Sequence, residues 1–179
     1  MNTVRENMLI YRIRHKQDAN AYGELYDIYV EPVYRFIFFK ISNKEEAEDA
    51  TSEVFIKAWH YVRSPEKDVD SFRRLVYTIA RNHVIDIYRK RAKEQTQTIE
   101  GSPDLEARTN LAAELDAKIE TESLLKAMTK LKQDYQDVLH LRYIEGMSVK
   151  EIAKIMDKPY GNVRVLLHRA VKKIKDLSA

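Results

Sequence analysis

The sequence predicts an all-α protein of two small helical domains joined by a flexible linker. Only four Gly and four Pro occur among 179 residues, a composition that favours helix. Apolar residues recur at helical spacing, and few segments alternate as a half-buried strand would. This period weakens after Glu94, where polar residues precede Gly101-Ser102-Pro103. The predicted domains are therefore residues 1–93 and 124–179, with a linker at 94–123.

The charge distribution divides the chain in the same way. The formal net charge of +3 consists of +2 over residues 1–92, −5 over 93–123 and +6 over 124–179, so the linker is acidic. The chain has no Cys, which excludes disulfides and thiolate metal sites and fits a reducing cytoplasm. The apolar run at residues 8–11 is too short for a signal peptide or a membrane span. We therefore expect a cytoplasmic protein without membrane insertion.

The N-terminal domain is predicted to contain at least three amphipathic helices. Asp18 is placed to cap the first, and its apolar pattern runs up to Pro32 and continues after it to Ile41. Asn43 and Glu46 have the spacing of a capping box, which begins an acidic helix. The predicted buried stripe of that helix consists of Ala47, Ala50, Val54 and Ala58.

A polar loop at residues 61–70 precedes a long helix, from Phe72 to about Lys93. The predicted core face of this helix consists of Phe72, Leu75, Val76, Ile79 and Ala80. In the C-terminal domain the apolar pattern is firm from Leu124, and Gly146 is placed to end a helix. The predicted second core begins with Leu124, Met128, Leu131, Val138, Leu139 and Leu141.

Residues 148–174 have the pattern of a helix-turn-helix. Ser148 and Glu151 form a second capping box. One face of the short helix that follows carries Val149, Ile152, Ala153 and Met156. After a tight turn, the buried face of the next helix carries Val163, Leu167, Ala170 and Ile174. Two short helices with matched apolar faces and a tight turn between them are typical of a helix-turn-helix.

The outward side of the second of these helices suits duplex DNA. We call it the recognition face, and it consists of Tyr160, Asn162, Arg164, Val165, His168, Arg169 and Lys172. Asn and Arg side chains can read base edges in the major groove, whereas Arg169 and Lys172 are better placed for phosphates. The alternative interpretation is a basic, solvated helix that ends a small bundle.

The acidic helix presents a second surface, opposite its buried stripe. We call it the acidic stripe, and it consists of Asp49, Ser52, Glu53 and Ile56 at positions i, i+3, i+4 and i+7. Two carboxylates beside one apolar side chain suit a basic partner helix. The alternative interpretation is a charged face that is simply solvated.

The long helix carries a third surface on its predicted non-core side. We call it the cationic patch, and it consists of Arg73, Arg74, Tyr77, Arg81, Asn82, Arg89 and Lys90. Arginines interleaved with an aromatic residue suit unpaired bases, because stacking one base returns about 1–3 kcal/mol. Melting a base-pair step forfeits roughly 1.4 kcal/mol. The alternative interpretation is a cationic helix end favoured by the helix dipole.

In combination, these motifs resemble the extracytoplasmic-function, or group IV, sigma factors of bacterial RNA polymerase. Residues 18–93 resemble sigma region 2 through Ala47-Glu48-Asp49, Glu53-Val54-Phe55 and Ile79-Ala80-Arg81-Asn82. Residues 124–177 resemble region 4 through Glu151-Ile152-Ala153 and Arg169-Ala170. The resemblance implies a non-catalytic initiation subunit that needs no cofactor.

The resemblance also implies a role for each surface. The acidic stripe would face the coiled coil of the β′ clamp of core RNA polymerase, and the β flap would be a further contact. The cationic patch and the loop at residues 61–70 would melt promoter DNA and hold the non-template strand of the −10 element. The recognition face would read the −35 element. The acidic linker would run towards the RNA exit path, and an anti-sigma factor would hold the protein inactive.

Some positions depart from the family pattern. Ser52 stands in place of a Gln, and Arg74 in place of a Trp, which moves single-strand capture from stacking towards charge. Asp157 replaces a Gly in the turn, where Asp tolerates a left-handed backbone. Pro159 replaces a Ser or Thr cap, and Leu166 replaces a basic residue.

Two other functions fit the sequence. A helix-turn-helix regulator that senses a ligand or dimerises through its N-terminal half would bind duplex DNA tightly without polymerase. An adaptor would bind polymerase or an anti-sigma partner without selecting promoters. An enzyme is not expected, because the five His residues are scattered and no metal-ligand pair, phosphate-binding Gly loop or nucleophile elbow occurs.

Overall fold

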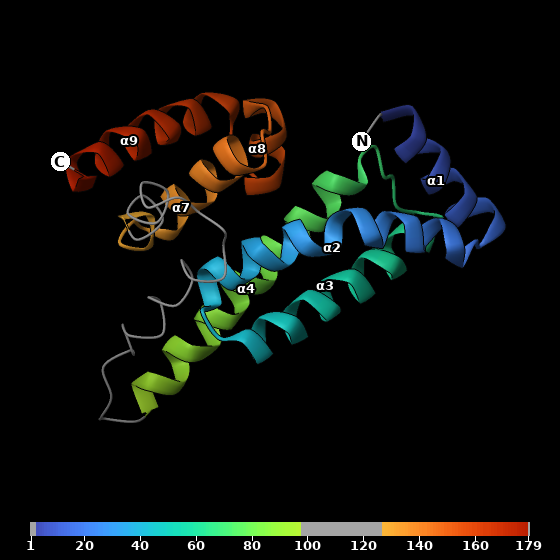
Figure 1. Ribbon diagram of the computed structural model, residues 1–179, viewed down its shortest axis with the longest axis horizontal. Helices are drawn as coiled ribbons and strands as arrows, with labels where there is room; N and C mark the ends of the chain where they lie inside the picture. The colour runs from blue at the N-terminus through green and yellow to red at the C-terminus, as the bar shows by residue number, and fades with distance from the viewer. Residues whose placement is uncertain (1–2, 98–126, 179) are drawn as a thin grey trace.

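The computed structural model describes residues 3–97 and 127–178, and every regular element in these two ranges is a helix (Figure 1). The N-terminal helices are α1 (Thr3–Lys16), α2 (Ala19–Ile41), α3 (Lys44–Arg63) and α4 (Phe72–Gln97). The C-terminal helices are α7 (Gln133–Leu139), the π-helical turn η2 (His140–Ile144), α8 (Val149–Met156) and α9 (Tyr160–Ser178). The predicted all-α class with two helical domains is confirmed. Within the same ranges, no helix is long and apolar enough to span a membrane.

Helix α2 is continuous through Pro32 and joins the two apolar segments on either side of it. It begins at Asp18, whose carboxylate accepts hydrogen bonds from the N–H groups of Asn20 and Ala21 at 3.0 and 3.1 Å, as an N-cap does. Proline inside a helix costs about 3 kcal/mol, and burial on both sides of it offsets that cost. The fully buried side chains of α2 include Leu25, Val33, Phe36 and Ile37.

Helix α3 packs against α2 and α4 (Figure 1). Asn43 caps it by accepting a hydrogen bond from the N–H of Glu46 at 2.9 Å, whereas the Glu46 carboxylate forms an ion pair with Arg91 of α4. The predicted buried stripe of this helix is confirmed, since each of its four side chains is at most 1% exposed: Ala47, Ala50, Val54 and Ala58.

Helix α1 packs on the N-terminal domain and fixes the start of α4. Its Leu9 and Ile13 are fully buried. The carboxylate of its Glu6, a buried residue, accepts hydrogen bonds from the N–H of Phe72 at 2.6 Å and from the hydroxyl of Tyr29 at 2.7 Å. A carboxylate at a helix N-terminus satisfies an unpaired N–H and interacts favourably with the helix dipole. The first helix is therefore an integral part of this domain.

The C-terminal domain contains the predicted helix-turn-helix, formed by α8 and α9. Its capping box is complete: Ser148 Oγ accepts from the N–H of Glu151 at 3.3 Å, and the Glu151 carboxylate accepts from the N–H of Ser148 at 2.8 Å. Asp157 ends α8 with φ at 50°. Gly146, which lies between η2 and Ser148, the N-cap of α8, has φ at 65°. Both angles fall in the left-handed region that favours glycine. The buried side chains of α9 are Val163, Ala170 and Ile174.

The end of α4 differs from the sequence pattern, because the helix runs to Gln97 instead of about Lys93. Most of the predicted acidic linker, residues 98–123, lies outside the described residues, as does Leu124 of the predicted second core. The other predicted members of that core are buried: Met128, Leu131, Val138, Leu139 and Leu141.

The two domains pack against each other along α4 (Figure 1). Helix α8 contacts α4 directly, and the ring of Phe36 in α2 meets that of His140 in η2 edge-on, with centroids 5.1 Å apart. The buried apolar side chains of both domains form one continuous cluster. The C-terminal domain therefore covers part of the surface of α4.

Candidate nucleic-acid and protein interfaces

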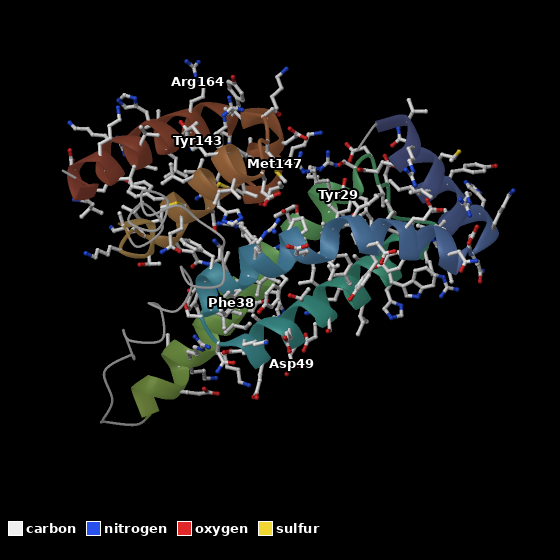
Figure 2. All side chains as sticks on the ribbon, viewed as in Figure 1. Tyr29, Phe38, Asp49, Tyr143, Met147 and Arg164 are labelled. Carbon is white, nitrogen blue, oxygen red and sulfur yellow. The ribbon has the colours of Figure 1, made fainter. Side chains whose placement is uncertain are left out.

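The acidic stripe lies on the side of α3 that faces away from the C-terminal domain (Figure 2). All four of its side chains are exposed, Ile56 to 57%. Glu53 lies 3.3 Å from Lys57 Nζ and 3.7 Å from His83 Nε2 of α4. Exposed pairs of this kind contribute little to stability and are readily exchanged for a partner's charges. The stripe therefore offers carboxylates and one apolar side chain to an approaching surface.

The recognition face lies along the outer side of α9, and all seven of its residues are exposed. Arg164 points away from the body of the molecule (Figure 2). Val163 and Ala170 on the opposite side of α9 are fully buried, so packing on that side fixes the orientation of the helix. A helix held in this way can present its exposed side chains to the major groove of DNA.

The cationic patch, in contrast, is divided by the C-terminal domain. Its exposed residues are Asn82, Arg89 and Lys90. Its partly or fully buried residues are Arg73, Arg74, Tyr77 and Arg81. The exposed part lies towards the C-terminal end of α4, and the covered part lies where α7, α8 and the turn between them approach.

The prediction that Tyr77 projects from the non-core side of α4 is wrong. Its side chain is 0% exposed, and its ring lies 5.4 Å from that of Phe36 in an edge contact. The reason is that α4 meets two neighbours, the pair α2–α3 on one side and the C-terminal domain on the next. Its buried surface therefore extends from Val76 to Tyr77, while Leu75 and Ile79 of the predicted core face are only partly buried.

Arg81 belongs to a group of four charged residues that lies between the domains. We call them the interdomain cluster, and they are Lys40, Arg81, Asp134 and Asp137. Arg81 Nε donates to Asp137 Oδ2 at 2.8 Å, and Arg81 Nη2 donates to Asp134 Oδ1 at 3.0 Å. Lys40 Nζ lies 3.1 Å from Asp137 Oδ1 as an ion pair without hydrogen-bond geometry, and both side chains are fully buried. Burial lowers the pKa of Lys40, and the attraction of Asp137 opposes that change.

A second polar group lies beside this cluster. Arg73 donates to the backbone carbonyl of Glu145, and the Glu145 carboxylate lies 3.4 Å from His140 Nε2. Burial alone would raise the pKa of Glu145, but the nearby His140, Tyr77 and Arg73 outweigh burial and lower it below that of an ordinary glutamate. Burial also lowers the pKa of His140, so its ring is neutral at neutral pH.

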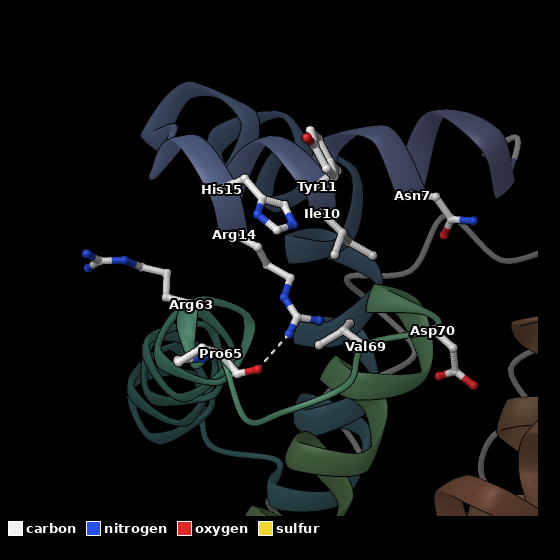
Figure 3. A pocket seen from close by; sticks show the side chains of 9 residues that line it. All are labelled: Asn7, Ile10, Tyr11, Arg14, His15, Arg63, Pro65, Val69 and Asp70. Atoms are coloured by element: carbon white, nitrogen blue, oxygen red, sulfur yellow. Dashed lines mark hydrogen bonds between the residues drawn. The ribbon is translucent and has the colours of Figure 1, made fainter.

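The loop between α3 and α4, predicted to touch the −10 strand, is fixed by α1. Arg14 Nη2 donates to the carbonyl of Pro65 at 3.2 Å, and Arg14 Nη1 lies 3.9 Å from Asp68. A cavity of about 460 Å³ lies between α1 and the loop, and Figure 3 shows the side chains that line it. It is lined by Asn7, Ile10, Tyr11, Arg14, His15, Arg63, Pro65, Val69 and Asp70. The sequence pattern does not indicate which surface residues 3–16 pack against, so the contact between α1 and this loop was not predicted.

Lys40 and Asp137 were also missed, although the sequence contains a signal for both. Lys40 interrupts the apolar segment at residues 36–41, and Asp137 directly precedes Val138 and Leu139 of the second core. Charged residues are almost never fully buried unless they are paired. Two opposite charges inside apolar segments therefore indicate a buried pair, but not which helices it joins. Among the described residues, no group of three or more His, Asp or Glu side chains is arranged to hold a metal ion.

Comparisons with known proteins agree with this arrangement. The family model described as "Sigma-70 region 2" matches residues 25–94, and the one described as "Sigma-70, region 4" matches residues 121–174. The ECF RNA polymerase sigma factor SigW of Bacillus subtilis is 31% identical over 188 residues, which cover 96% of this chain and 100% of SigW. The ECF RNA polymerase sigma factor BldN of Streptomyces coelicolor is 32% identical over 161 residues, which cover 89% of this chain but 61% of BldN.

Two solved structures share the fold. CnrH in complex with the cytosolic domain of CnrY has a TM-score of 0.71 and 22% identity, covering 97% of this chain and 96% of that one. The sigma factor RpoE in complex with the anti-sigma factor NepR, from Bartonella quintana, has a TM-score of 0.66 and 18% identity, covering 87% and 94%. Similarity at these identities shows the fold alone. The family itself is shown by the matches to both family models and by the similarity to the full length of SigW. The chain belongs to the extracytoplasmic-function (ECF) family of RNA polymerase sigma factors.

Proposed function

We propose that this protein binds core RNA polymerase and directs transcription initiation at one class of promoters, by recognising a −35 element and opening a −10 element. One observation carries the proposal: a helix-turn-helix with a fully exposed recognition face and an exposed acidic stripe occur in one chain, on opposite sides of the molecule. A simple duplex-binding regulator has no need for the second surface. The protein would act in the cytoplasm, and it would have no catalytic activity of its own because the polymerase supplies the chemistry.

In this proposal, the acidic stripe docks on the coiled coil of the β′ clamp, and the C-terminal domain also meets the β flap. Asp49 and Glu53 lie one helical turn apart on the surface of α3, so both can pair with cations on one partner helix. Exposed Ile56 adds an apolar contact at the same surface. Charge complementarity of this kind speeds association and fixes the register of the two partners.

The recognition face is proposed to read the −35 element in the major groove. Asn162 and Arg164 lie near the start of α9, the part of a recognition helix that contacts base edges. Arg169 and Lys172 lie further along the same exposed side and suit phosphates, which position the protein without selecting sequence.

The −10 element is proposed to be held by the cationic patch without Tyr77, because the side chain of Tyr77 is buried. Asn82, Arg89 and Lys90 are accessible as they stand. Arg74 is partly buried and pairs with Asp70 of the adjoining loop, with Nη1 and Oδ2 2.8 Å apart, so the loop and the patch form one surface.

An anti-sigma factor is proposed as the regulator. Support comes from the two structural neighbours, since RpoE is bound to the anti-sigma factor NepR and CnrH to the cytosolic domain of CnrY. The exposed surfaces on α3 and α9 are the features that such a partner would have to cover.

Run-off transcription with purified core polymerase on a library of genomic fragments tests the proposed function. We expect discrete transcripts from a small set of fragments when the chain is added, and none of these from core polymerase alone. The same fragments should bind the chain weakly when polymerase is absent. Tight, sequence-specific duplex binding by the chain alone, without specific transcripts, would instead identify a helix-turn-helix regulator.

A further inference from the structure

We propose that His83 of α4 is a positioning residue of the polymerase-docking surface, and that it controls through Lys57 how much negative charge the acidic stripe presents to its partner. The ring lies beside the stripe but comes from the neighbouring helix. The inference rests on the proposed docking of the acidic stripe on core RNA polymerase. It adds to that surface a group that can take up a proton.

Three side chains meet where α3 packs against α4. Lys57 Nζ lies 3.1 Å from His83 Nδ1 and 3.3 Å from Glu53 Oε2. The other ring nitrogen, His83 Nε2, lies 3.7 Å from the same carboxylate oxygen. The imidazole is 14% exposed, whereas the side chains of Lys57 and Glu53 are 52% and 58% exposed. His83 is therefore the most buried member of the group, and the two charged ends lie at the surface.

The contact with Lys57 defines the neutral form of the ring. An ammonium group has three N–H donors and no acceptor, so Nδ1 of His83 accepts a hydrogen bond from Lys57. A neutral imidazole carries one proton, which then lies on Nε2, the nitrogen that faces Glu53. In this form His83 holds the ammonium group of Lys57 against α4. Both contacts of Glu53 involve Oε2, so a cation of the partner can approach through Oε1.

The surroundings of the ring favour its neutral form at neutral pH. Burial and the charge of Lys57 lower the pKa of His83 below its ordinary value of 6.5, although Glu53 and Asp86 oppose this. Glu53 and Lys57 belong to α3, and Asp86 lies one turn further along α4. The ring is therefore neutral at pH 7 and becomes protonated as the pH falls below 6.5.

Protonation changes the docking surface in two ways. An imidazolium has no acceptor, so it releases Lys57 and repels its ammonium group. It also adds a positive charge beside Glu53, next to a surface that is proposed to bind a basic helix. Like charges across an interface oppose association, so the docked state binds this proton less tightly than the free protein does. Docking is therefore strongest when His83 is neutral, and it weakens as the pH falls through the lowered pKa.

Two substitutions of His83 separate its acceptor from its charge. The amide oxygen of His83→Gln can still accept from Lys57, but the side chain takes up no proton in this pH range. His83→Leu offers Lys57 no acceptor. His15→Gln, at an exposed position of α1, is the matched control, because it removes a histidine outside the acidic stripe. Circular dichroism establishes that each variant remains helical.

NMR titration of the His83 ring tests the geometry in the free protein. The signals of this ring are those that disappear in His83→Gln. We expect the neutral form to carry its proton on Nε2. Lys57→Met should raise the pKa of His83 because it removes a cation from Nδ1, and Glu53→Gln should lower it because it removes an anion from Nε2. A neutral proton on Nδ1, or a pKa that neither substitution changes, would overturn the proposal.

Anisotropy of the labelled full-length chain measures affinity for core polymerase between pH 5 and 8. The polymerase has titratable groups of its own, so each variant is compared with the unchanged chain at the same pH. On acidification, the unchanged chain should lose about threefold more affinity than His83→Gln, the scale of one exposed charge pair. His15→Gln should follow the unchanged chain. The difference should shrink at high salt, which screens exposed charges.

The role of the acceptor is measured at pH 8, where the ring is neutral. His83→Leu should bind core polymerase about two- to threefold more weakly than the unchanged chain, because Lys57 is then free to turn towards the partner. Adding Lys57→Met to His83→Leu should restore the affinity, which repair of a merely structural defect would not do. Parallel pH profiles for His83→Gln and the unchanged chain would overturn the proposal, as would full affinity of His83→Leu. Absence of binding by the unchanged chain at pH 8 would contradict the proposed function itself, and this inference with it.

Discussion

The recognition face of α9 and the cationic patch of α4 are built from similar side chains, and the structure treats them in opposite ways. Every residue of the recognition face is exposed, whereas four of the seven patch residues are partly or fully buried. Within the described residues, helix α9 packs mainly on α7 and α8, whereas α4 packs on α2, α3 and α8. A cationic helix surface is therefore available to DNA only where the rest of the fold leaves it uncovered.

The largest effect is expected at the acidic stripe, whose four residues are all exposed. Asp49→Lys combined with Glu53→Lys places cations against a basic partner, and like-charge juxtaposition costs several kcal/mol. We expect affinity for core polymerase to fall by about a hundredfold or more, measured by fluorescence anisotropy of labelled protein, with an unchanged circular dichroism spectrum.

The matched control for that change is Asp27→Lys combined with Glu31→Lys. These residues have the same spacing and are exposed on α2, outside the acidic stripe. Polymerase affinity should stay within about threefold of the original, the scale of exposed ion pairs. Equal losses in the two double variants would show that overall charge, and not the acidic stripe, governs docking.

The exposed recognition face should give a sequence-dependent effect. Arg164→Ala should remove about 1–3 kcal/mol of discrimination at one position of the −35 element, the value of one good base contact. Lys172→Ala, as the comparison, should weaken binding to all sequences alike and lower the salt slope by about one. Holoenzyme binding to a set of −35 variants measures both. A uniform loss for Arg164→Ala would place that side chain on phosphate.

The cationic patch lies on α4, and Glu6→Gln tests how much the anchoring of the start of α4 contributes to the stability of the fold. The buried carboxylate accepts from the N–H of Phe72 and the hydroxyl of Tyr29. Disturbing buried hydrogen bonds to a charged group costs about 1–3 kcal/mol, so the denaturant midpoint should fall. Glu24→Gln, which weakens partly exposed pairs with Arg5 and Arg12, should cost less than about 1 kcal/mol. Equal costs would contradict the role of Glu6 as an anchor of α4.

The smallest effect concerns the pH dependence of domain docking. Burial lowers the pKa of His140 below its ordinary value of 6.5, although Glu145 and Asp137 oppose this and Lys40 adds to it. Below pH 6.5, the open or unfolded state binds a proton that the docked state does not, so docking weakens as the pH falls towards the lowered pKa. The slope should stay below about 1.4 kcal/mol per pH unit.

Unfolding midpoints between pH 5 and 8 measure this slope. His140→Gln should flatten it in that window, whereas His168→Gln, on the exposed recognition face, should leave it unchanged. Stability that rises on acidification through this window would contradict a buried, neutral His140. Glu145, whose pKa is also lowered, contributes only near and below its ordinary value of 4.5.

The sequence predicted those parts of the fold in which local pattern and packing agree. The Ser148 capping box, the buried stripe of α3 and the exposed face of α9 each follow from the period of a helix with one buried side. Tyr77 was wrongly predicted to be exposed because α4 has two buried sides. The apolar periodicity of one helix does not show that a second element packs against it. The same limit hid the partners of Lys40 and Asp137, which lie on helices far apart in the chain.

Permanganate reactivity of thymines in a −10 element tests the central claim most directly, because it detects unpaired bases. A promoter fragment from the transcription screen is probed with the chain, with core polymerase, and with both together. We predict reactive thymines only when both are present, and fewer of them with Arg81→Ala. Reactive thymines with the chain alone, or none with both, would contradict the account of a promoter-opening subunit that works on the polymerase.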